Sequence, residues 1–335
     1  MSMTQDIITM DYGSGGRRTS QLIEELLLPQ LGNEQLNRLA DGAVLELDGP
    51  LVFSTDSFVV SPLFFPGGDI GKLAVCGTVN DLSMCGGTPR YLSLGFILEE
   101  GFPMDDLRRI VASIGDTAAD CGVSIVTGDT KVVERGRGDG IYINTSGVGN
   151  LTWPGLSTEN LREGDRIIVS GPIGNHGATV MLARSGMMEG SGLSSDCQPL
   201  HRLAAAALSQ GGVRVLRDPT RGGVATTLNE FVEGSGLCVE LDEGALPVDE
   251  PVRVACSMLG LDPLYCANEG KLLLAADPEQ AEEILAALRS VPGGEQAAEI
   301  GIVSKQYPGK VVLKTYTGGA RVLSKLTGAQ LPRIC

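Results

Sequence analysis

The last residue of the chain is a cysteine, which places a thiol at the tip of the C-terminal segment Pro332-Arg333-Ile334-Cys335. Because no residue lies beyond it, such a thiol could enter a narrow pocket tip first and carry a bound group there. Terminal residues are more often frayed and without function. The hypothesis of a carrier arm therefore requires a reaction site elsewhere in the chain, and the residues below favour one that binds ATP.

Four aspartates lie at the ends or flanks of successive predicted elements, and we interpret them as metal ligands. A carboxylate among apolar residues is costly to bury without a partner. Hard oxygen ligands on separate elements suit Mg²⁺ held together with substrate phosphates. Any one of them alone is explained as well by a cap or turn. The four residues are Asp41, Asp56, Asp81 and Asp129.

A glycine-rich run near the N-terminus precedes a helical pattern. Glycines allow a backbone to approach a ligand closely, and amides at a helix start can bind phosphate. A flexible lead-in to the helix explains the same run equally well. The candidate phosphate-binding residues are Gly13, Ser14, Gly15 and Gly16.

A helix beginning after Asp69 adds further candidates for nucleotide binding. Asp69 is placed to cap this helix, and Lys72 falls in its first turn, where the helix dipole disfavours a cation. A nearby phosphate would offset that cost, although a solvated lysine is the simpler explanation. Asn80 and Asp81 follow on the same helix, beside its apolar face.

The second half of the chain carries its own polar groups. Arg217, Asp218 and Arg221 surround a Gly-Gly helix entrance, which suits an anion. Glu269 follows small and apolar residues, so burial could raise its pKa toward the range of a general base, although a turn carboxylate paired with Lys271 is an equal alternative.

Two further candidates come from loops. We predict that Asp129 and Lys131 lie just past the end of a strand over 123–126, where loops carry function. His176 could act as a base, but a loop histidine that caps the following helix is favoured.

The hydrophobic pattern predicts an α/β (α+β) protein in two domains, with the junction near residue 155. Pro103 is expected to start a helix that Gly122 closes. The turn-rich stretch from Trp153 to Glu159 marks the change between domains. We predict an ATP-binding and dimerisation domain over 1–154, a second α/β domain over 155–324 and a flexible tail over 325–335 that carries Cys335.

Charge and composition limit the partners. The formal net charge is −15 with no basic run, which argues against nucleic acid and against an anionic membrane surface. The sequence lacks a stretch of about 18 apolar residues that could cross a membrane. Eight cysteines occur without a Cys-x-x-Cys pair, a poor signature for zinc or disulfides. We expect a soluble cytoplasmic protein.

Taken together, the motifs resemble the HypE family of hydrogenase maturation proteins, within the PurM-like superfamily that includes aminoimidazole ribonucleotide (AIR) synthetase. The resemblance covers almost the whole chain, and the terminal Pro-Arg-Ile-Cys is its most specific part. The motifs are Ser54-Thr55-Asp56-Ser57, Gly77-Thr78-Val79-Asn80-Asp81-Leu82, Thr127-Gly128-Asp129-Thr130-Lys131, Arg217-Asp218-Pro219-Thr220-Arg221-Gly222-Gly223 and Ala267-Asn268-Glu269-Gly270-Lys271.

The resemblance implies a homodimer in which the N-terminal domains of two subunits form a barrel, with ATP near the interface. It implies that a HypF-type carbamoyltransferase loads Cys335 and that ATP-dependent dehydration converts the thiocarboxamide to a thiocyanate. The cyanide would then pass to iron on a HypC–HypD complex for [NiFe]-hydrogenase. Mg²⁺ would be held by the four aspartates, and Lys131 and Glu269 would lie nearest the thiocarboxamide, with their roles of base and charge stabiliser unassigned.

Two alternatives remain from the sequence. Another PurM-like synthetase or kinase would phosphorylate a small molecule, but a terminal cysteine is not expected of those enzymes, and selenophosphate synthetases generally place their reactive Cys or Sec in the N-terminal loop, where this chain has Tyr12 and Ser14. An ATP-gated scaffold would use Cys335 only for contact with a partner. From Gly328 to Cys335 the chain spans roughly 26 Å when fully extended, enough for a swinging arm. We further predict that Arg333 or a partner offsets the effect of the terminal carboxylate on the thiol.

Overall fold

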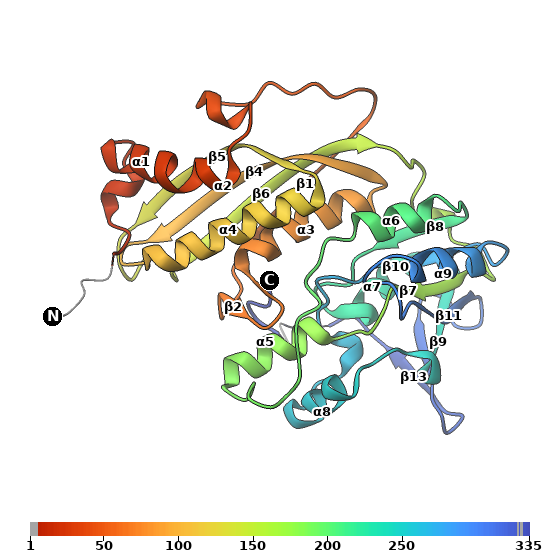
Figure 1. The fold of residues 1–335 in the computed structure, drawn as a ribbon. Helices are drawn as coiled ribbons and strands as arrows, with labels where there is room; N and C mark the ends of the chain where they lie inside the picture. The colour runs from red at the N-terminus through yellow and green to blue at the C-terminus, as the bar shows by residue number, and fades with distance from the viewer. Residues whose placement is uncertain (1–5, 327, 329–330) are drawn as a thin grey trace.

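The computed structural model describes residues 6–326, 328 and 331–335, which form two groups of strands and helices (Figure 1). The first half of the chain builds a four-stranded sheet, and the second half builds a seven-stranded sheet. The C-terminus returns to a place between the two halves, near β2 and α5 (Figure 1). The tail tip therefore lies where residues from both halves can reach it.

The four-stranded sheet has the strand order β1-β6-β4-β5. β1 and β6, and β6 and β4, pair antiparallel, whereas β4 and β5 pair parallel. Consequently β1 and β5 are the two edges of this sheet. Its strands are β1 (Leu51–Phe58), β4 (Gly87–Glu99), β5 (Ser124–Val133) and β6 (Ile141–Leu151), and β2 (Phe64–Phe65) pairs separately with β3 (Gly68–Asp69).

Helices α3 (Ile70–Met84) and α4 (Met104–Cys121) lie side by side on one face of this sheet (Figure 1). Asp69 caps α3, because its Oδ1 accepts hydrogen bonds from the amides of Gly71 and Lys72 at 2.7 and 3.1 Å. Gly122 ends α4 in the left-handed conformation, with φ of 66°. The predicted starts of both helices and the predicted end of α4 are confirmed, since the signals that set them are local.

One predicted boundary in this half is wrong. The strand expected over 123–126 continues to Val133, so Asp129 and Lys131 lie within β5 and not in the loop after it. The extension is stabilised by pairing with β4, where Gly95 and Ile97 are the partners of Asp129 and Lys131. The part of β5 after residue 126 is polar and lies at the sheet edge, so it lacks the alternation of apolar residues that predicts a strand. The predicted strand therefore ends too early.

Short helical segments before β1 pack against α4 and the β5 edge. The polar and apolar residues of this region alternate irregularly, and one segment is a π-helix. These segments are η1 (Met10–Gly13), α1 (Arg17–Leu22), η2 (Ile23–Leu27), α2 (Leu28–Leu31) and η3 (Leu36–Arg38).

The seven-stranded sheet has the order β13-β12-β9-β11-β7-β10-β8 and is antiparallel except for the β12/β9 pair. Apolar side chains form separate buried clusters on its two faces, one with α7 and one with α6 and α9. The strands are β7 (Arg166–Val169), β8 (Val213–Arg217), β9 (Cys238–Asp242), β10 (Leu273–Ala276), β11 (Ala298–Ser304), β12 (Val311–Lys314) and β13 (Ala320–Leu323).

Five α-helices and three short 3₁₀ segments accompany this sheet in the described residues. His176 lies in the first turn of α5 and is fully buried, so its predicted place in a loop is wrong. The helices are α5 (Asn175–Ser185), α6 (His201–Leu208), α7 (Gly223–Val232), α8 (Glu250–Leu259) and α9 (Ala281–Arg289), with η4 (Thr158–Asn160), η5 (Glu243–Ala245) and η6 (Pro263–Tyr265).

The tail tip is docked in the protein. Ile334 and Cys335 belong to the apolar core of the N-terminal half and are 4 and 7 % exposed. The part of the predicted flexible tail that the structure describes near its end is therefore bound, while Thr327, Ala329 and Gln330 lie outside the described residues.

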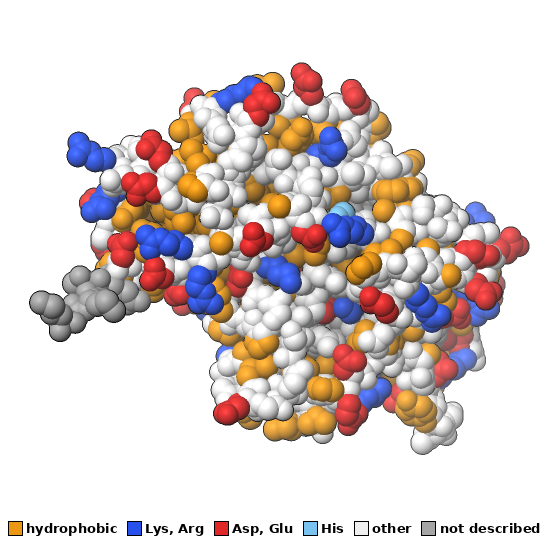
Figure 2. All heavy atoms as spheres, viewed as in Figure 1, with side chains coloured by type: hydrophobic (Ala, Val, Ile, Leu, Met, Phe, Trp, Pro, Cys, Tyr) orange, Lys and Arg blue, Asp and Glu red, His pale blue; other side chains and the backbone are white. Residues whose placement is uncertain are grey.

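The charged side chains lie on the surface and are mixed with neutral and apolar groups. On the face shown in Figure 2, acidic and basic side chains are interspersed among apolar and neutral atoms. Among the described helices, none is both long enough and apolar enough to cross a membrane.

Candidate active site

The tail tip ends in a cleft between the two halves of the molecule, which we call the acidic cleft. Its volume is about 300 Å³. It is lined by β1, α3, the entrance of α7 and the loop before β10, so segments distant in sequence supply its walls. The lining residues are Thr55, Asp56, Gly77, Asp81, Asp218, Thr220, Arg221, Thr227, Glu230, Glu269 and Cys335.

Asp56 and Asp81 enter the cleft from β1 and α3, which pack closely at Gly77. A Cβ at Gly77 would lie 2.8 Å from the ring of Phe58, so only glycine allows this approach. Ser54 donates a hydrogen bond of 2.6 Å to Asp81 Oδ2. Burial raises the pKa of Asp81 despite that bond, and the negative charge of Asp56 raises it further.

Asp218 and Glu269 make the cleft more acidic from the other side. Burial, with a contribution from Asp81, raises the pKa of Asp218 to about 6. Burial also raises the pKa of Glu269 well above its usual value, with contributions from Cys335 and Asp218. Within the described part of the chain, Glu269 Oε1 is buried without a hydrogen-bond partner. Lys271 pairs with Asp196 at 3.4 Å, so the alternative of a Glu269–Lys271 pair is not realised.

These carboxyl groups can hold a divalent cation together with other ligands such as phosphate oxygens. Asp56, Asp81 and Asp218 supply only oxygen ligands, and burial and repulsion between carboxylates raise the pKa of Asp81 and of Asp218. A bound cation would relieve both costs, as it does where Mg²⁺ binds carboxylates and phosphates together.

In the same cleft, the thiol of Cys335 faces the guanidinium of Arg221. Burial raises the pKa of its thiol, whereas Arg221 opposes that rise through a hydrogen bond and its positive charge. Arg221 also lies 3.9 Å from Asp56 Oδ1. Of the two predicted sources, Arg333 or a partner, Arg333 does not act on the thiol of the docked tail, because Arg333 forms an ion pair with Asp139 and Arg221 faces the thiol.

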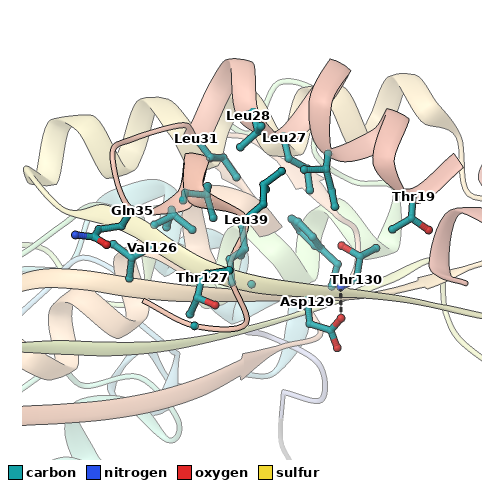
Figure 3. A pocket seen from close by; sticks show the side chains of 18 of the residues that line it. Thr19, Leu27, Leu28, Leu31, Gln35, Leu39, Val126, Thr127, Asp129 and Thr130 are labelled. Carbon is teal, nitrogen blue, oxygen red and sulfur yellow. Dashed lines mark hydrogen bonds between the residues drawn. The ribbon is translucent and has the colours of Figure 1, made fainter. Parts of the chain in front are cut away.

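A second hollow lies beneath the N-terminal helical segments, and we call it the helical-cap pocket (Figure 3). Its volume is about 310 Å³. Leucines from η2 and α2 point down toward β5, and Thr130 points up from that strand, whereas the carboxylate of Asp129 lies on the other side of the strand (Figure 3). An apolar wall of leucines opposite a polar threonine suits a ligand that has one apolar and one polar part.

The predicted glycine-rich run borders the helical-cap pocket. Gly13 and Gly15 line it, and a Cβ at Gly13 would lie 2.5 Å from the amide nitrogen of Val132. Glycine therefore allows η1 to contact β5. Ser14 Oγ donates to Asp11 O at 3.1 Å, and Gly16 is the exposed N-cap residue of α1.

Asp129 and Lys131 form an exposed ion pair on the open face of β5, at the edge of this pocket, with 2.7 Å between Oδ1 and Nζ. The hydrogen bond from Lys131 lowers the pKa of Asp129. Because β5 and β1 are opposite edges of the sheet, Lys131 and Glu269 do not line one cleft within a single chain.

The four predicted metal ligands are divided between the two sites. Asp56 and Asp81 line the acidic cleft, Asp129 lines the helical-cap pocket, and exposed Asp41 lies between two residues that line the same pocket. In the described residues, no cluster of three or more His, Cys, Asp or Glu is placed to hold a metal by itself. A single chain therefore does not gather the four aspartates.

Lys72 and Asn80 lie outside both sites. Lys72 Nζ donates to Gly67 O at 3.1 Å and borders other hollows of the surface. Asn80 is buried, and its amide bonds to Leu200 N at 2.7 Å and Gln198 O at 3.2 Å. Asn80 thus links α3 to the second half of the chain.

The sequence interpretation missed Thr220, Thr227 and Glu230 of the cleft, and Arg184 and Asp139 around the tail. The Gly-Gly helix entrance was a usable signal for the first three, because they flank it. Single polar residues at 139 and 184 carry no sequence signal for a contact with a segment about 150–200 residues away.

Comparison with known proteins identifies both halves. Residues 39–151 match the family described as AIR synthase related protein, N-terminal domain, and residues 162–314 match the corresponding C-terminal domain. A protein of Azotobacter vinelandii named carbamoyl dehydratase HypE is 53% identical over 332 residues, which cover 98% of this chain and 97% of that protein.

Solved structures agree with that similarity. A crystal structure of hydrogenase maturation protein HypE in complex with ATP has 53% identity and a TM-score of 0.94, covering 97% of this chain and 99% of that one. A crystal structure of a HypE–HypF complex has 45% identity and a TM-score of 0.80, covering 91% of this chain and 99% of its match.

Proposed function

The chain belongs to the carbamoyl dehydratase HypE family, built from the two AIR synthase related domains, and from this membership we propose how its residues divide the reaction. It is an ATP-dependent enzyme that dehydrates a carbamoyl group carried on Cys335. The observation that supports the residue roles is the buried Cys335 thiol beside Arg221, in the same cleft as Glu269.

The reaction needs an activated oxygen and two proton losses. The oxygen of the S-carbamoyl group attacks the γ-phosphorus of ATP, ADP leaves, and one N–H proton is lost. The second N–H proton and the phosphate then depart, which leaves an S-cyano cysteine. Because the amide oxygen alone is a poor leaving group, phosphorylation must come before elimination.

We assign Glu269 as the acceptor of an N–H proton. A carboxyl group with a raised pKa is a stronger base once it is ionised, and Glu269 Oε1 has no partner among the described residues that would compete for the proton. Arg221 is assigned to charge stabilisation near the sulfur. Lys131, whose role the sequence left open, is then assigned as a second charge stabiliser, supplied by another subunit as set out below.

ATP and Mg²⁺ are assigned to the two sites together. The nucleoside fits the helical-cap pocket, with Gly13 and Gly15 at its border. Asp56, Asp81 and Asp218 would hold Mg²⁺ in the acidic cleft. When bound there, Mg²⁺ neutralises the phosphate charge that develops during phosphoryl transfer.

A homodimer would bring the acidic cleft of one subunit close to the β5 edge that borders the helical-cap pocket of the other. The face of the four-stranded sheet opposite α3 and α4 exposes Phe53, Leu51 and Ile97, at 70, 50 and 45 %. Ile97 is the direct partner of Lys131 across the β4/β5 pair, so both point to that open face. We propose that two such faces pack into a barrel, which carries Asp129 and Lys131 of one subunit toward the acidic cleft of the other.

We also propose the remaining partners and the location. The family includes a HypE–HypF complex, so a HypF-type carbamoyltransferase is assigned as the donor to Cys335. A HypC–HypD complex is assigned as the acceptor of cyanide. A working thiol requires a reducing compartment, which supports a cytoplasmic location.

The function is tested by the mass of the C-terminal peptide. After incubation with the carbamoyltransferase, its substrates and ATP, we expect Cys335 to gain a carbamoyl group and then to lose the mass of one water. Cys335→Ala should carry neither change, while Cys85→Ala, which removes an exposed cysteine distant in sequence from the tail, should behave like the wild type. A carbamoyl adduct that persists with ATP would contradict dehydration.

A further inference from the structure

The tail tip runs beside residues 59–61 and is held there by backbone hydrogen bonds. Val59 N donates to Cys335 O at 3.1 Å, and Ser61 N donates to Arg333 O at 3.3 Å. In return, Arg333 Nε donates to Val59 O at 3.0 Å. The tail is therefore bound in one register along this segment.

A single arginine on α5 joins the tail to the same segment. Arg184 Nη1 donates to Pro332 O at 2.7 Å, and Nη2 donates to Arg333 O at 2.9 Å. Nε and Nη2 also donate to Ser61 O, at 3.1 and 2.7 Å. All these acceptors are backbone carbonyls, so the guanidinium recognises the path of the chain and not its side chains.

The next carbonyl of the tail is bound by a histidine of the same helix. His176 Nε2 lies 2.8 Å from Ile334 O, and Nδ1 lies 2.8 Å from Ser195 Oγ. Because a carbonyl only accepts, Nε2 carries the proton and Nδ1 accepts from Ser195. Three consecutive carbonyls, those of residues 332–334, thus each receive a donor from one face of α5.

The docked conformation is not the one that the free tail prefers. Arg333 has φ of 52°, a left-handed conformation that is uncommon for residues other than glycine. Holding it requires compensating contacts, which Arg184, His176 and the Arg333–Asp139 ion pair supply. Loss of part of this set should release the tail without unfolding the domain, since the side chains of Pro332 and Arg333 are already exposed.

We propose that Arg184 and His176 are positioning residues that form a main-chain clamp for the tail. The clamp sets the balance between a docked thiol in the acidic cleft and a released thiol that a carbamoyl donor can reach. This inference rests on the proposed function for its purpose, but the clamp itself is a binding equilibrium that can be measured without the reaction.

The test is the alkylation rate of Cys335 by iodoacetamide, followed by peptide mass spectrometry on the full-length protein. Arg184→Ala should raise that rate about 10-fold or more, because bonds to a charged donor are lost from two tail carbonyls. Cys85 is exposed and serves as an internal reference whose rate should not change. Arg253→Ala, on the exposed side of α8, is the matched control and should leave both rates unchanged.

Two further measurements separate positioning from a general structural effect. Arg184→Lys, which keeps the charge and some donors, should restore part of the protection of Cys335. In Arg184→Ala, dehydration of preloaded protein in a single turnover should slow about 10-fold, whereas carbamoyl loading should be as fast as in the wild type or faster. An unchanged alkylation rate in Arg184→Ala would overturn the clamp, and a wild type that never yields the cyano product would instead overturn the function.

Discussion

The acidic cleft and the helical-cap pocket both present aspartates, but in opposite electrostatic states. Asp129 is exposed, and its pairing with Lys131 lowers its pKa. Asp218 is partly buried near Asp81, and its pKa rises to about 6. Asp129 is paired with a lysine of its own chain, whereas the opposing effect of Arg217 on Asp218 is smaller than the effects of burial and of Asp81.

This difference shows why residue type alone does not assign a role. A carboxylate that is already paired and solvated, such as Asp129, gains little electrostatic free energy when it contacts a ligand. A crowded set such as the partly buried Asp81 and Asp218 with the buried Glu269 is costly until a cationic ligand arrives. Relief of that cost on binding is then available to the reaction.

The largest effect should come from Glu269. Glu269→Gln should slow dehydration of the loaded Cys335 by about 10²–10⁴-fold, because the base is lost. In the wild type the rate should rise with pH, since Glu269 accepts a proton only when ionised, and its raised pKa moves that rise above the usual carboxyl range. Single-turnover rates from pH 5 to 9 check this expectation. A rise of the same size and position in Glu269→Gln would contradict it.

The next effect tests whether the two sites belong to different subunits. Lys131→Ala and Cys335→Ala homodimers should each be inactive or strongly impaired. A mixed dimer with one change in each subunit should regain about half the wild-type activity per dimer, because one site then combines the intact Cys335 of one chain with the intact Lys131 of the other. Differently tagged subunits, purified as mixed dimers, allow the measurement. Recovery would not occur if Lys131 served the cleft of its own chain.

The smallest effect concerns stability. Asp218→Asn should raise the free energy of unfolding at pH 7.5, without nucleotide or metal, by on the order of 1–3 kcal/mol. The folded-state pKa of Asp218 lies above the unfolded value, so its favourable contribution is present below about pH 4 and is lost as pH rises through about 6. The gain should therefore vanish at pH 4, and urea unfolding at both pH values measures it. Asp129→Asn is the control and should not be stabilising, because it removes an ion pair of the exposed kind.

Local signals predicted much of the fold. Asp69, Pro103 and Gly122 set helix ends through contacts within a few residues, and these ends were found where expected. The small and apolar neighbours of Glu269 in sequence suggested burial and a raised pKa as one of two alternatives, and the structure has that one. Features of this kind depend on residues nearby in sequence and hardly on the rest of the fold.

Features that depend on distant segments were not predictable. Asp129 and Lys131 are in a strand because β4 pairs with them, and that pairing joins residues about 34 positions apart. Arg221 faces Cys335 only because the tail returns between the two halves, 114 positions further along the chain. The sequence identified these residues as candidates by their chemical type but could not predict their neighbours in the fold.

The carbonyl-only contacts of Arg184 and His176 also affect how this region can evolve. Because the clamp binds the backbone, mutations at Pro332 and Arg333 can change the strength of docking while the position of the thiol is kept. Selection on the tail can therefore adjust the fraction of time that the arm is free, almost independently of the chemistry at its tip. A set of variants at these two positions would provide proteins that differ in the strength of tail docking but share the same catalytic cleft.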